Sequence, residues 1–156
     1  MLNGFSIEPL AQHRQAIPVL REWFEMEWPS YYGVGGQGSA LRDLQAYANQ
    51  GSLPVGVVVL RAGSVCGVAV LKAESIPSHR HLSPWAAAGL VQPAMRGQGI
   101  GRLLLGGVEE QARKLGFARI FCGTSTAQNL LQRCGWQLLE SINHEGKDLG
   151  VYQKAL

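Results

Sequence analysis

The chain has 156 residues, of which 46% are hydrophobic and 16% charged, so it can bury one core without metals or disulfide bridges. Its formal net charge of +3 suits an anionic small ligand. A nucleic-acid partner is not expected, because such proteins carry a dense stripe of Lys and Arg that is absent from this sequence. We therefore expect a single domain that spans residues 1–156.

The cysteines and the hydropathy pattern indicate the compartment. Cys66, Cys122 and Cys134 are odd in number and widely spaced, which argues against a disulfide framework and against a cysteine-rich zinc site. The N-terminus lacks a basic segment followed by an apolar run, and no stretch approaches the ~20 apolar residues that span a bilayer. We expect a cytoplasmic protein without a metal or a membrane partner.

Turn and cap residues divide the first half of the chain into elements. Pro18 is favoured in a first helical turn, and Ser39 is a candidate N-cap for a second helix that Gly51 can end. Two β-branched runs joined by residues 62–64 are typical of a hairpin. In chain order we expect a strand at residues 5–9, helices at 18–28 and 39–51 separated by a glycine-rich loop at 29–38, and strands at 55–61 and 65–73.

The second half predicts a strand, a long helix and a final group of short elements. Residues 85–92 are a continuous apolar run that ends before Pro93, which favours a strand buried on both faces. A helix is expected between Gly99 and Gly116, because apolar residues recur there at helical spacing. The remaining elements are a strand at 118–123, a helix at 126–134, and strands at 136–142 and 149–154.

The turn between that strand and the long helix is rich in glycine. Gly97, Gly99 and Gly101 can adopt positive φ and add no Cβ, so the backbone N–H groups of the helix N-terminus can approach a phosphate closely. A dinucleotide fingerprint is excluded because it would need glycine at Arg102 or Leu104, and no Walker A sequence is present. The alternative is that the glycines serve only a tight turn.

Residues 90–101 read LVQPAMRGQGIG and resemble the Gln/Arg-x-x-Gly-x-Gly/Ala signature of the GCN5-related N-acetyltransferase (GNAT) family. The defining positions are occupied by Arg96, Gly99 and Gly101. Further along the chain, Leu130 and Gly135-Trp136 resemble a later part of the family pattern. The resemblance implies an α/β fold of GNAT type, with a mixed and mostly antiparallel central sheet of about seven strands flanked by about four helices.

The resemblance also implies a function. It is that of an acyltransferase that moves the acetyl group of acetyl-CoA to a primary amine of a small molecule or peptide by direct attack, without a metal. The pyrophosphate of the coenzyme would lie on the amides of residues 98–102, and its pantetheine arm would pair with a strand edge left open if residues 85–92 splay from 118–123. The implied coenzyme-binding residues are Leu90, Val91, Arg96, Gly97, Gln98, Gly99, Ile100, Gly101, Arg102 and Asn129.

The family's usual catalytic side chains are not all present. Where many members have a tyrosine that protonates the leaving thiolate this chain has Leu131, and Thr124 stands in place of an asparagine. Ser125, Tyr152 or water could supply the proton instead. A backbone N–H of the strand at residues 85–92 is the implied donor to the oxyanion.

The sequence also leaves more than one candidate for the general base. Residues 83–85 include no carboxylate, although members often have one there. Glu74, His79 or His81, in the preceding connection, could accept the ammonium proton through water, and a solvated polar loop is the alternative explanation. His79 with His81 makes a weak metal site without a third ligand.

Aromatic residues after the first helix suggest where the acceptor binds. Trp28, Tyr31 and Tyr32 could wall a pocket that attracts an ammonium group, or they could simply pack against the loop. The acidic residues nearby in the sequence are Glu22, Glu25 and Glu27. A non-catalytic acyl-CoA binding or sensing module is the alternative function, because the usual tyrosine and carboxylate are missing, and a homodimer is left open.

Overall fold

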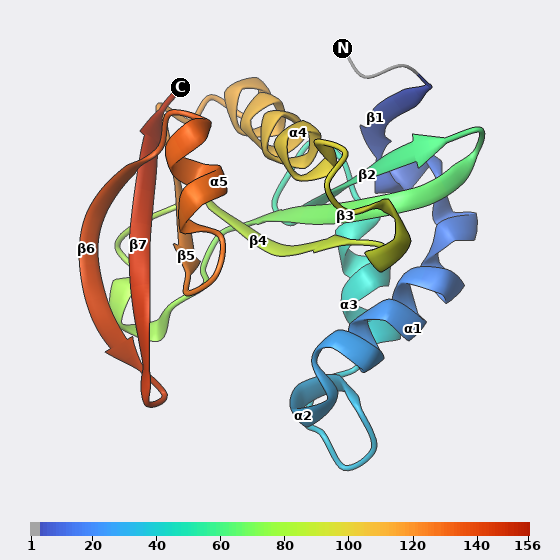
Figure 1. The fold of residues 1–156 in the computed structure, drawn as a ribbon, viewed down its shortest axis with the longest axis horizontal. Coiled ribbons are helices and arrows are strands. Elements are labelled where there is room, and N and C mark those ends of the chain that lie inside the picture. The colour runs from blue at the N-terminus through green and yellow to red at the C-terminus, as the bar shows by residue number, and fades with distance from the viewer. Residues whose placement is uncertain (1–3) are drawn as a thin grey trace.

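A seven-stranded mixed sheet forms the centre of the molecule in a computed structural model, which describes residues 4–156 (Figure 1). The strand order is β1-β2-β3-β4-β5-β7-β6, and neighbours are antiparallel except for β4 and β5, which are parallel. This arrangement confirms the expected sheet class. The strands are β1 (Phe5–Pro9), β2 (Val55–Arg61), β3 (Ser64–Lys72), β4 (Trp85–Val91), β5 (Arg119–Thr124), β6 (Gln137–His144) and β7 (Lys147–Ala155).

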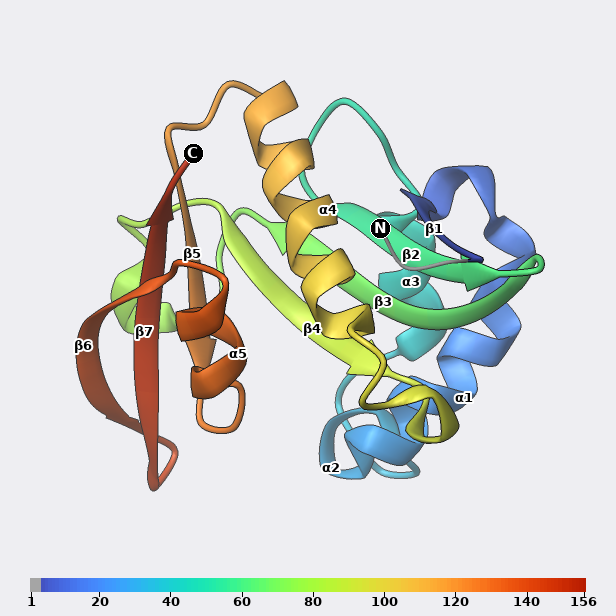
Figure 2. The same cartoon turned by 45° about the horizontal axis from the view of Figure 1, so that its top comes forward.

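Helices cover both faces of the β2–β3 part of the sheet. In Figures 1 and 2, α1 and α3 lie on one face and α4 crosses the other. None of the helices within residues 4–156 is long and apolar enough to cross a membrane. The α-helices are α1 (Ile17–Glu27), α2 (Pro29–Tyr32), α3 (Ala40–Tyr47), α4 (Ile100–Lys114) and α5 (Gln128–Arg133).

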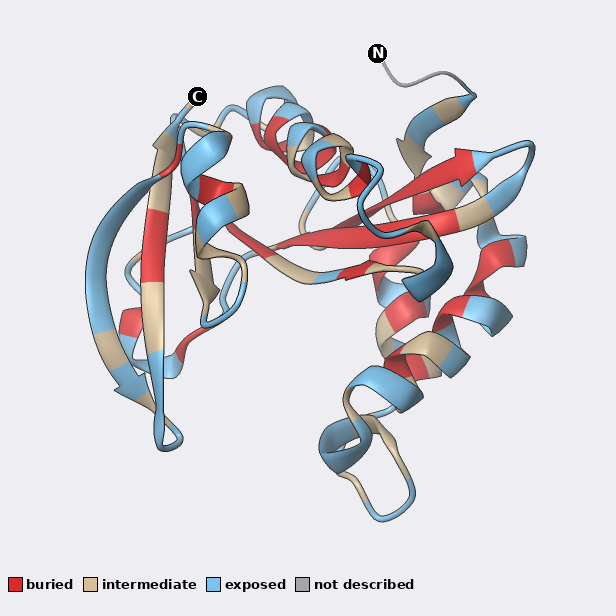
Figure 3. Cartoon of the chain, in the orientation of Figure 1, coloured by how far each residue is buried: buried red, intermediate tan, exposed pale blue. Residues whose placement is uncertain are grey.

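Two hydrophobic cores lie on opposite faces of the central strands. Val58 packs with Leu20 of α1 and Leu44 of α3, whereas its neighbour Val57 packs with Leu104 of α4. Successive strand residues point to opposite faces, so a run of valines in β2 supplies both cores. Figure 3 shows the buried segments concentrated in these strands and on the inner sides of the helices. The result is a fixed platform for the neighbouring strand β4.

Strands β4 and β5 are joined only where β4 begins. Trp85 and Phe121 form the single register pair between them, and beyond this pair the strands diverge, as Figures 1 and 2 show. A bulge adds to the divergence, because Ala88 has φ of 52° and the register with β3 shifts beside it. The splay on which the pantetheine hypothesis depends is therefore present.

The second half of β4 is not buried on both faces, contrary to the sequence-based expectation. Ala87 and Ala88 are half-buried and Gly89 is exposed. The run of small apolar residues suggested a strand within a closed sheet, but divergence of β5 removes its neighbour on one edge. These residues therefore border an opening.

The expected loop at residues 29–38 contains a short helix, α2, because Pro29 can begin a helical turn. Contact with α3 holds this helix in place. The Tyr32 hydroxyl donates a hydrogen bond of 2.6 Å to the Asp43 carboxylate, and burial together with this carboxylate raises the pKa of Tyr32. Residues 4–156 therefore contain one α-helix more than the four that the sequence predicted.

The boundaries of the later helices also differ from those expected. Ser39 caps α3 as predicted, since its Oγ accepts a hydrogen bond of 3.2 Å from the N–H of Arg42. However, α3 ends at Tyr47 and not near Gly51. Helix α5 begins only after residue 127, because the side chain of Thr124 closes the turn before it.

Candidate active site

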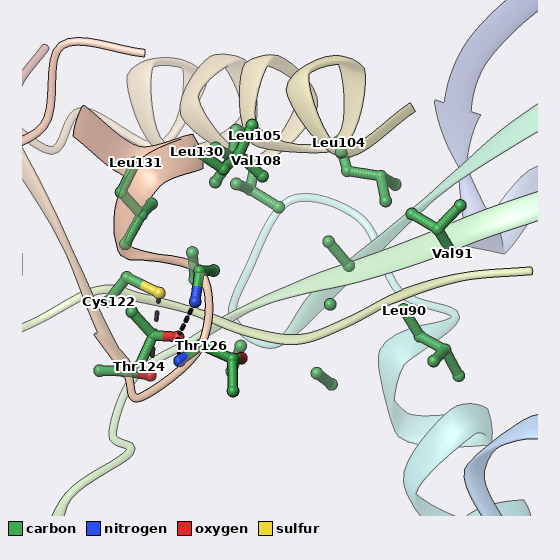
Figure 4. A pocket seen from close by; sticks show the side chains of 18 of the residues that line it. Leu90, Val91, Leu104, Leu105, Val108, Cys122, Thr124, Thr126, Leu130 and Leu131 are labelled. Atoms are coloured by element: carbon green, nitrogen blue, oxygen red, sulfur yellow. Dashed lines mark hydrogen bonds between the residues drawn. The ribbon is translucent and has the colours of Figure 1, made fainter. Parts of the chain in front are cut away.

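The gap between β4 and β5 opens into a cleft of about 760 Å³. Its walls are the second half of β4, the inner side of α4, the end of β5 with the loop that follows, and α5. Figure 4 shows Leu90 and Val91 on one side of the cleft and Cys122, Thr124 and Thr126 on the other, with leucines of α4 and α5 between them. The C-terminal end of α1 reaches the same cleft through two residues, Glu27 and Trp28.

A second hollow, of about 780 Å³, lies at the N-terminus of α4. It shares Val91, Arg96, Gly101 and Leu130 with the cleft, so the two spaces adjoin. Arginines surround this hollow: Arg96, Arg102 and Arg133. The free N–H groups and positive end of a 15-residue helix add to their charge. Together these groups form a site for an anion such as a pyrophosphate.

The three glycines of the turn have different physical roles. Gly97 and Gly99 have φ of 82° and 85°, where other residues are strained. Gly101 is part of the helix, and a Cβ there would lie 3.0 Å from Leu130 Cδ2 on α5. Backbone conformation therefore explains the first two glycines, and close packing of α4 against α5 explains the third.

Strand β4 presents polar backbone groups to the cleft at Val91. The N–H of Gln92 donates to the carbonyl of Cys66 on β3 at 2.9 Å. Because alternate residues of an edge face the same neighbour, the N–H and C=O of Val91 point away from β3. Its carbonyl accepts a hydrogen bond of 3.2 Å from Arg96 Nε, and its N–H is open toward the space that β5 leaves.

Arg96 links the glycine-rich turn before α4 to the other side of the cleft. Besides its bond to Val91, its Nη2 lies 3.8 Å from Oε1 of Glu27 at the end of α1. Both side chains are about half exposed, so this ion pair contributes little to stability. Its importance is positional, because it brings the last carboxylate of α1 beside the anion site.

Most residues implied in coenzyme binding lie around these two spaces. Two do not line either space: Gln98, whose amide reaches toward Met95 Sδ, and Asn129, which is exposed on α5. The binding roles of all ten residues remain predictions. The residues that the structure brings together are Leu90, Val91, Arg96, Gly97, Gly99, Ile100, Gly101 and Arg102.

The loop after β5 supplies hydroxyl groups to the cleft. Thr124 closes this loop, because its Oγ1 accepts hydrogen bonds from the N–H groups of Thr126 at 3.2 Å and Ala127 at 2.9 Å (Figure 4). Ser125 and Thr126 also line the cleft and are exposed. The hydroxyl of Thr124 is thus engaged in shaping the turn, whereas Ser125 is exposed in the cleft lining.

Leu131 and Cys122 form the apolar inner end of the cleft. Leu131 is 1% exposed and belongs to the core beneath α4. Burial raises the pKa of the Cys122 thiol to about 12, so this thiol is protonated at neutral pH. A protonated thiol is a poor nucleophile, which supports packing as the role of Cys122.

The remaining catalytic candidates lie outside the cleft lining. Tyr152 is 3% exposed on β7 beside Cys122, and its ring covers Gly150. Glu74 is exposed and lies 3.9 Å from Arg80. His81 stacks on the buried His79, at 5.7 Å between ring centroids.

His79 explains why that connection is ordered. Its ring contacts Ser78 on one side and the carboxylate of Glu140 on β6 on the other. The structure therefore does not bring Glu74, His81, Ser125 and Tyr152 together. Among these four residues only Ser125 lines the cleft.

Glu27 is the site residue that sequence reasoning did not select. The sequence showed it as one of three glutamates near an aromatic segment, with nothing to separate it from the others. Its position one residue before Trp28-Pro29, where α1 must end, was the available signal. Trp28 packs edge-on against Phe24 with ring centroids 5.2 Å apart, and this contact fixes the helix end beside the cleft.

Comparison with known proteins agrees with this geometry. Residues 19–136 match the model of the acetyltransferase (GNAT) family, so the chain belongs to this family and the expected acyltransferase class is confirmed. The comparison with curated proteins found no match.

Solved structures share the fold at low sequence identity. An aminoglycoside 6'-N-acetyltransferase complexed with coenzyme A is 12% identical, with a TM-score of 0.77 and 96% of both chains covered. YncA from Salmonella typhimurium, solved with acetyl-CoA, is 19% identical, with a TM-score of 0.73 over 98% of this chain and 94% of that one. A ribosomal-protein-alanine N-acetyltransferase from Brucella melitensis is 21% identical, with a TM-score of 0.73 and coverage of 97% and 99%.

Proposed function

We propose that the protein transfers the acetyl group of acetyl-CoA to a primary amine by direct attack, without an acyl-enzyme. The observation that carries this proposal is that the anion site at the N-terminus of α4 adjoins the cleft that opens where β5 leaves β4. A long, bent ligand with an anionic end and an amide-bearing arm fits such a path. Coenzyme A has this form, and it or acetyl-CoA is bound in two of the solved neighbours.

The coenzyme is placed by groups that face this path. Its pyrophosphate would accept hydrogen bonds from the amides of residues 98–102, with Arg96 and Arg102 beside it. Its pantetheine arm would pair with the outward N–H of Val91, which supplies the partner that β5 does not. The thioester would then lie near the bulge at Ala88, between α4 and the loop after β5.

The reaction needs three events in this space. The ammonium group loses one proton to a base or to water, and the neutral nitrogen attacks the thioester carbon to form a tetrahedral intermediate. As the C–S bond breaks, the nitrogen gives up a second proton, and coenzyme A leaves as a thiolate that takes up a proton. A backbone N–H of β4 would stabilise the oxyanion. Ser125 or water would protonate the thiolate. Glu74 and His81 lie outside the cleft lining, so we expect them to act as bases only through water.

Steady-state release of free coenzyme A across an amine panel tests the proposal. We expect amine-dependent release of thiol and formation of an N-acetyl product of the corresponding mass. Binding of acetyl-CoA without turnover of any amine would favour the alternative, a non-catalytic acyl-CoA binding module. Hydrolysis of acetyl-CoA at a rate that does not depend on amine would contradict transfer to an amine.

A further inference from the structure

The cleft contains almost no charge. Among the described residues that line it, Glu27 is the one acid and Arg96 the one base. Their side chains lie 3.8 Å apart, so the charges nearly cancel at neutral pH. An acceptor with several ammonium groups would find one carboxylate to bind and an arginine that repels it.

The rest of the wall is small, apolar or hydroxyl-bearing. β4 contributes alanines and Gly89, and the helices contribute leucines such as Leu104 and Leu130. On the opposite side Leu149 of β7 reaches the cleft. Burying an apolar body against such a wall is favourable, because apolar surface is removed from water. A second ammonium group would lose water there without gaining a partner.

The acceptor must enter from the side that the coenzyme leaves free. If the coenzyme follows α4 and β4, the remaining approach lies between Glu27 and Trp28 at the end of α1 and Ser125 with Leu149 on the other side. Apolar residues close to Glu27 in the chain are strongly exposed: Met26 at 81%, Tyr31 at 50% and Val34 at 109%. None of these three residues lines the cleft, so they bear on the approach to it and not on its wall.

We infer that the acceptor is an amine with one ammonium group on an apolar or uncharged body, and that Glu27 binds this ammonium group. The inference rests on the proposed function and narrows its substrate class. Before the coenzyme binds, Arg96 is paired with Glu27. The coenzyme pyrophosphate competes for the Arg96 guanidinium and so leaves the Glu27 carboxylate free for the amine. Polyamines and aminoglycosides are therefore poor acceptors, although aminoglycoside acetyltransferases share the fold.

A matched pair of amines tests the substrate class. Hexylamine and 1,6-diaminohexane have the same chain and differ in the second ammonium group. We expect kcat/KM to be about tenfold or more higher for hexylamine, since the second charge meets no partner in the cleft. 2-Phenylethylamine should follow hexylamine, and kanamycin should follow the diamine.

The reverse order, with the diamine or kanamycin the better acceptor, would overturn the inference and leave the acetyl transfer itself standing. Turnover of no amine by a protein that binds acetyl-CoA would instead overturn the proposed function, and the inference with it. Equal values for the two matched amines would also count against a single-charge site.

Substitution of Glu27 tests its role, with a control on the same helix. In Glu27→Gln we expect the KM for hexylamine to rise about tenfold while kcat changes little, because the lost interaction is a uniform binding contact. The Kd of acetyl-CoA should stay the same or fall, because Arg96 loses the carboxylate that competes with the pyrophosphate. Glu22→Gln, at an exposed position of α1 that does not line the cleft, should leave KM, kcat and Kd unchanged. Identical kinetics of the two variants, or a loss confined to kcat in Glu27→Gln, would contradict ammonium binding by Glu27.

Discussion

Gly101 and Gly106 lie on the same helix but face different surroundings. Substituting each in turn separates an effect at the anion site from a general effect on the helix. A Cβ at Gly101 would approach Leu130 at the anion site, whereas at Gly106 it would meet nothing within 4 Å. We expect Gly101→Val to weaken acetyl-CoA binding about tenfold or more, and Gly106→Val to leave it unchanged. Titration calorimetry measures the affinities, and circular dichroism checks the fold. Equal affinities would show that the start of α4 does not hold the coenzyme.

Ser125 is the hydroxyl that we expect to protonate the leaving thiolate. General acid catalysis contributes about 10²–10⁴-fold, and a coenzyme thiolate is a fair leaving group by itself, so Ser125→Ala should lower kcat by about 10²-fold at most. The Kd of acetyl-CoA should not change. Thr126→Ala is the matched control, because it removes a neighbouring hydroxyl that also lines the cleft. If both variants keep the parent kcat, water delivers the proton.

The buried position of Leu131 changes how the missing tyrosine should be tested. The position lies in the core at 1% exposure, and a tyrosine there adds volume to a packed region. Overpacking of this kind destabilises by about 1–3 kcal/mol. A gain in turnover from Leu131→Tyr would thus be masked by a loss of fold stability, which makes Ser125→Ala the cleaner experiment.

At the scale of elements, one buried carboxylate connects α4 to β7 and to the chain that enters β6. Glu109 Oε1 lies 2.9 Å from Lys154 Nζ, and Glu109 Oε2 accepts a hydrogen bond of 3.3 Å from Trp136 Nε1. We expect Glu109→Ala to lower the free energy of unfolding by about 2 kcal/mol, less than for a fully buried pair, because Lys154 is 24% exposed. Urea unfolding measures the change.

Glu110→Ala is the control for that prediction. Glu110 is the next residue on α4, its side chain is 56% exposed, and it contacts only Arg113 among the ion pairs of the described chain. Its replacement should change stability by about 0.5 kcal/mol or less. Equal destabilisation by the two substitutions would mean that helix propensity, and not the connection through Glu109, determines the result.

The elements that the sequence predicted well are those fixed by local rules. The strand pair β2–β3, the start of α4 and its end at Gly116 depend on β-branched runs, on glycine and on helical spacing, all of which are local. The short helix α2 was missed because one turn in a glycine-rich segment has no periodicity to detect. The exposure of Gly89 was missed because it depends on where β5 goes, which is a property of the whole sheet.

The candidate site likewise contains residues that local sequence patterns predicted and residues that they could not predict. The glycine-rich turn was predictable because its residues are consecutive and because Gly97 and Gly99 have positive φ. Glu27 and Arg96 are far apart in the sequence, and only the packing of α1 beside the β4 end brings them to 3.8 Å. Glu74 and His81 were plausible from their order along the chain, but the connection that carries them packs toward β6 through His79 and Glu140. Side chains selected by sequence order alone could not be placed relative to the cleft.

At the scale of the whole molecule, the sheet consists of two parts with few bonds between them. Strands β1 to β4 form one part and β5, β7 and β6 the other, and one register pair, Trp85 with Phe121, joins them. A ligand that lies between the diverging strands adds contacts to both parts. Its binding should therefore stabilise the fold globally and protect the open edge of β4 locally.

Hydrogen exchange can separate the global from the local effect. At ~100 times its Kd, any ligand that binds only the folded state adds about 2.7 kcal/mol of stability, so acetyl-CoA and adenosine 3',5'-bisphosphate should raise the Tm equally at matched saturation. Only acetyl-CoA carries a pantetheine arm. We expect it alone to slow exchange of the Val91 amide, whose N–H points away from β3. The Leu90 amide is the internal control, since it faces Val68 on β3 and should be protected in every state. Equal protection of Val91 by both ligands, or by neither, would show that the arm does not pair with this edge and that the splayed strands have another role.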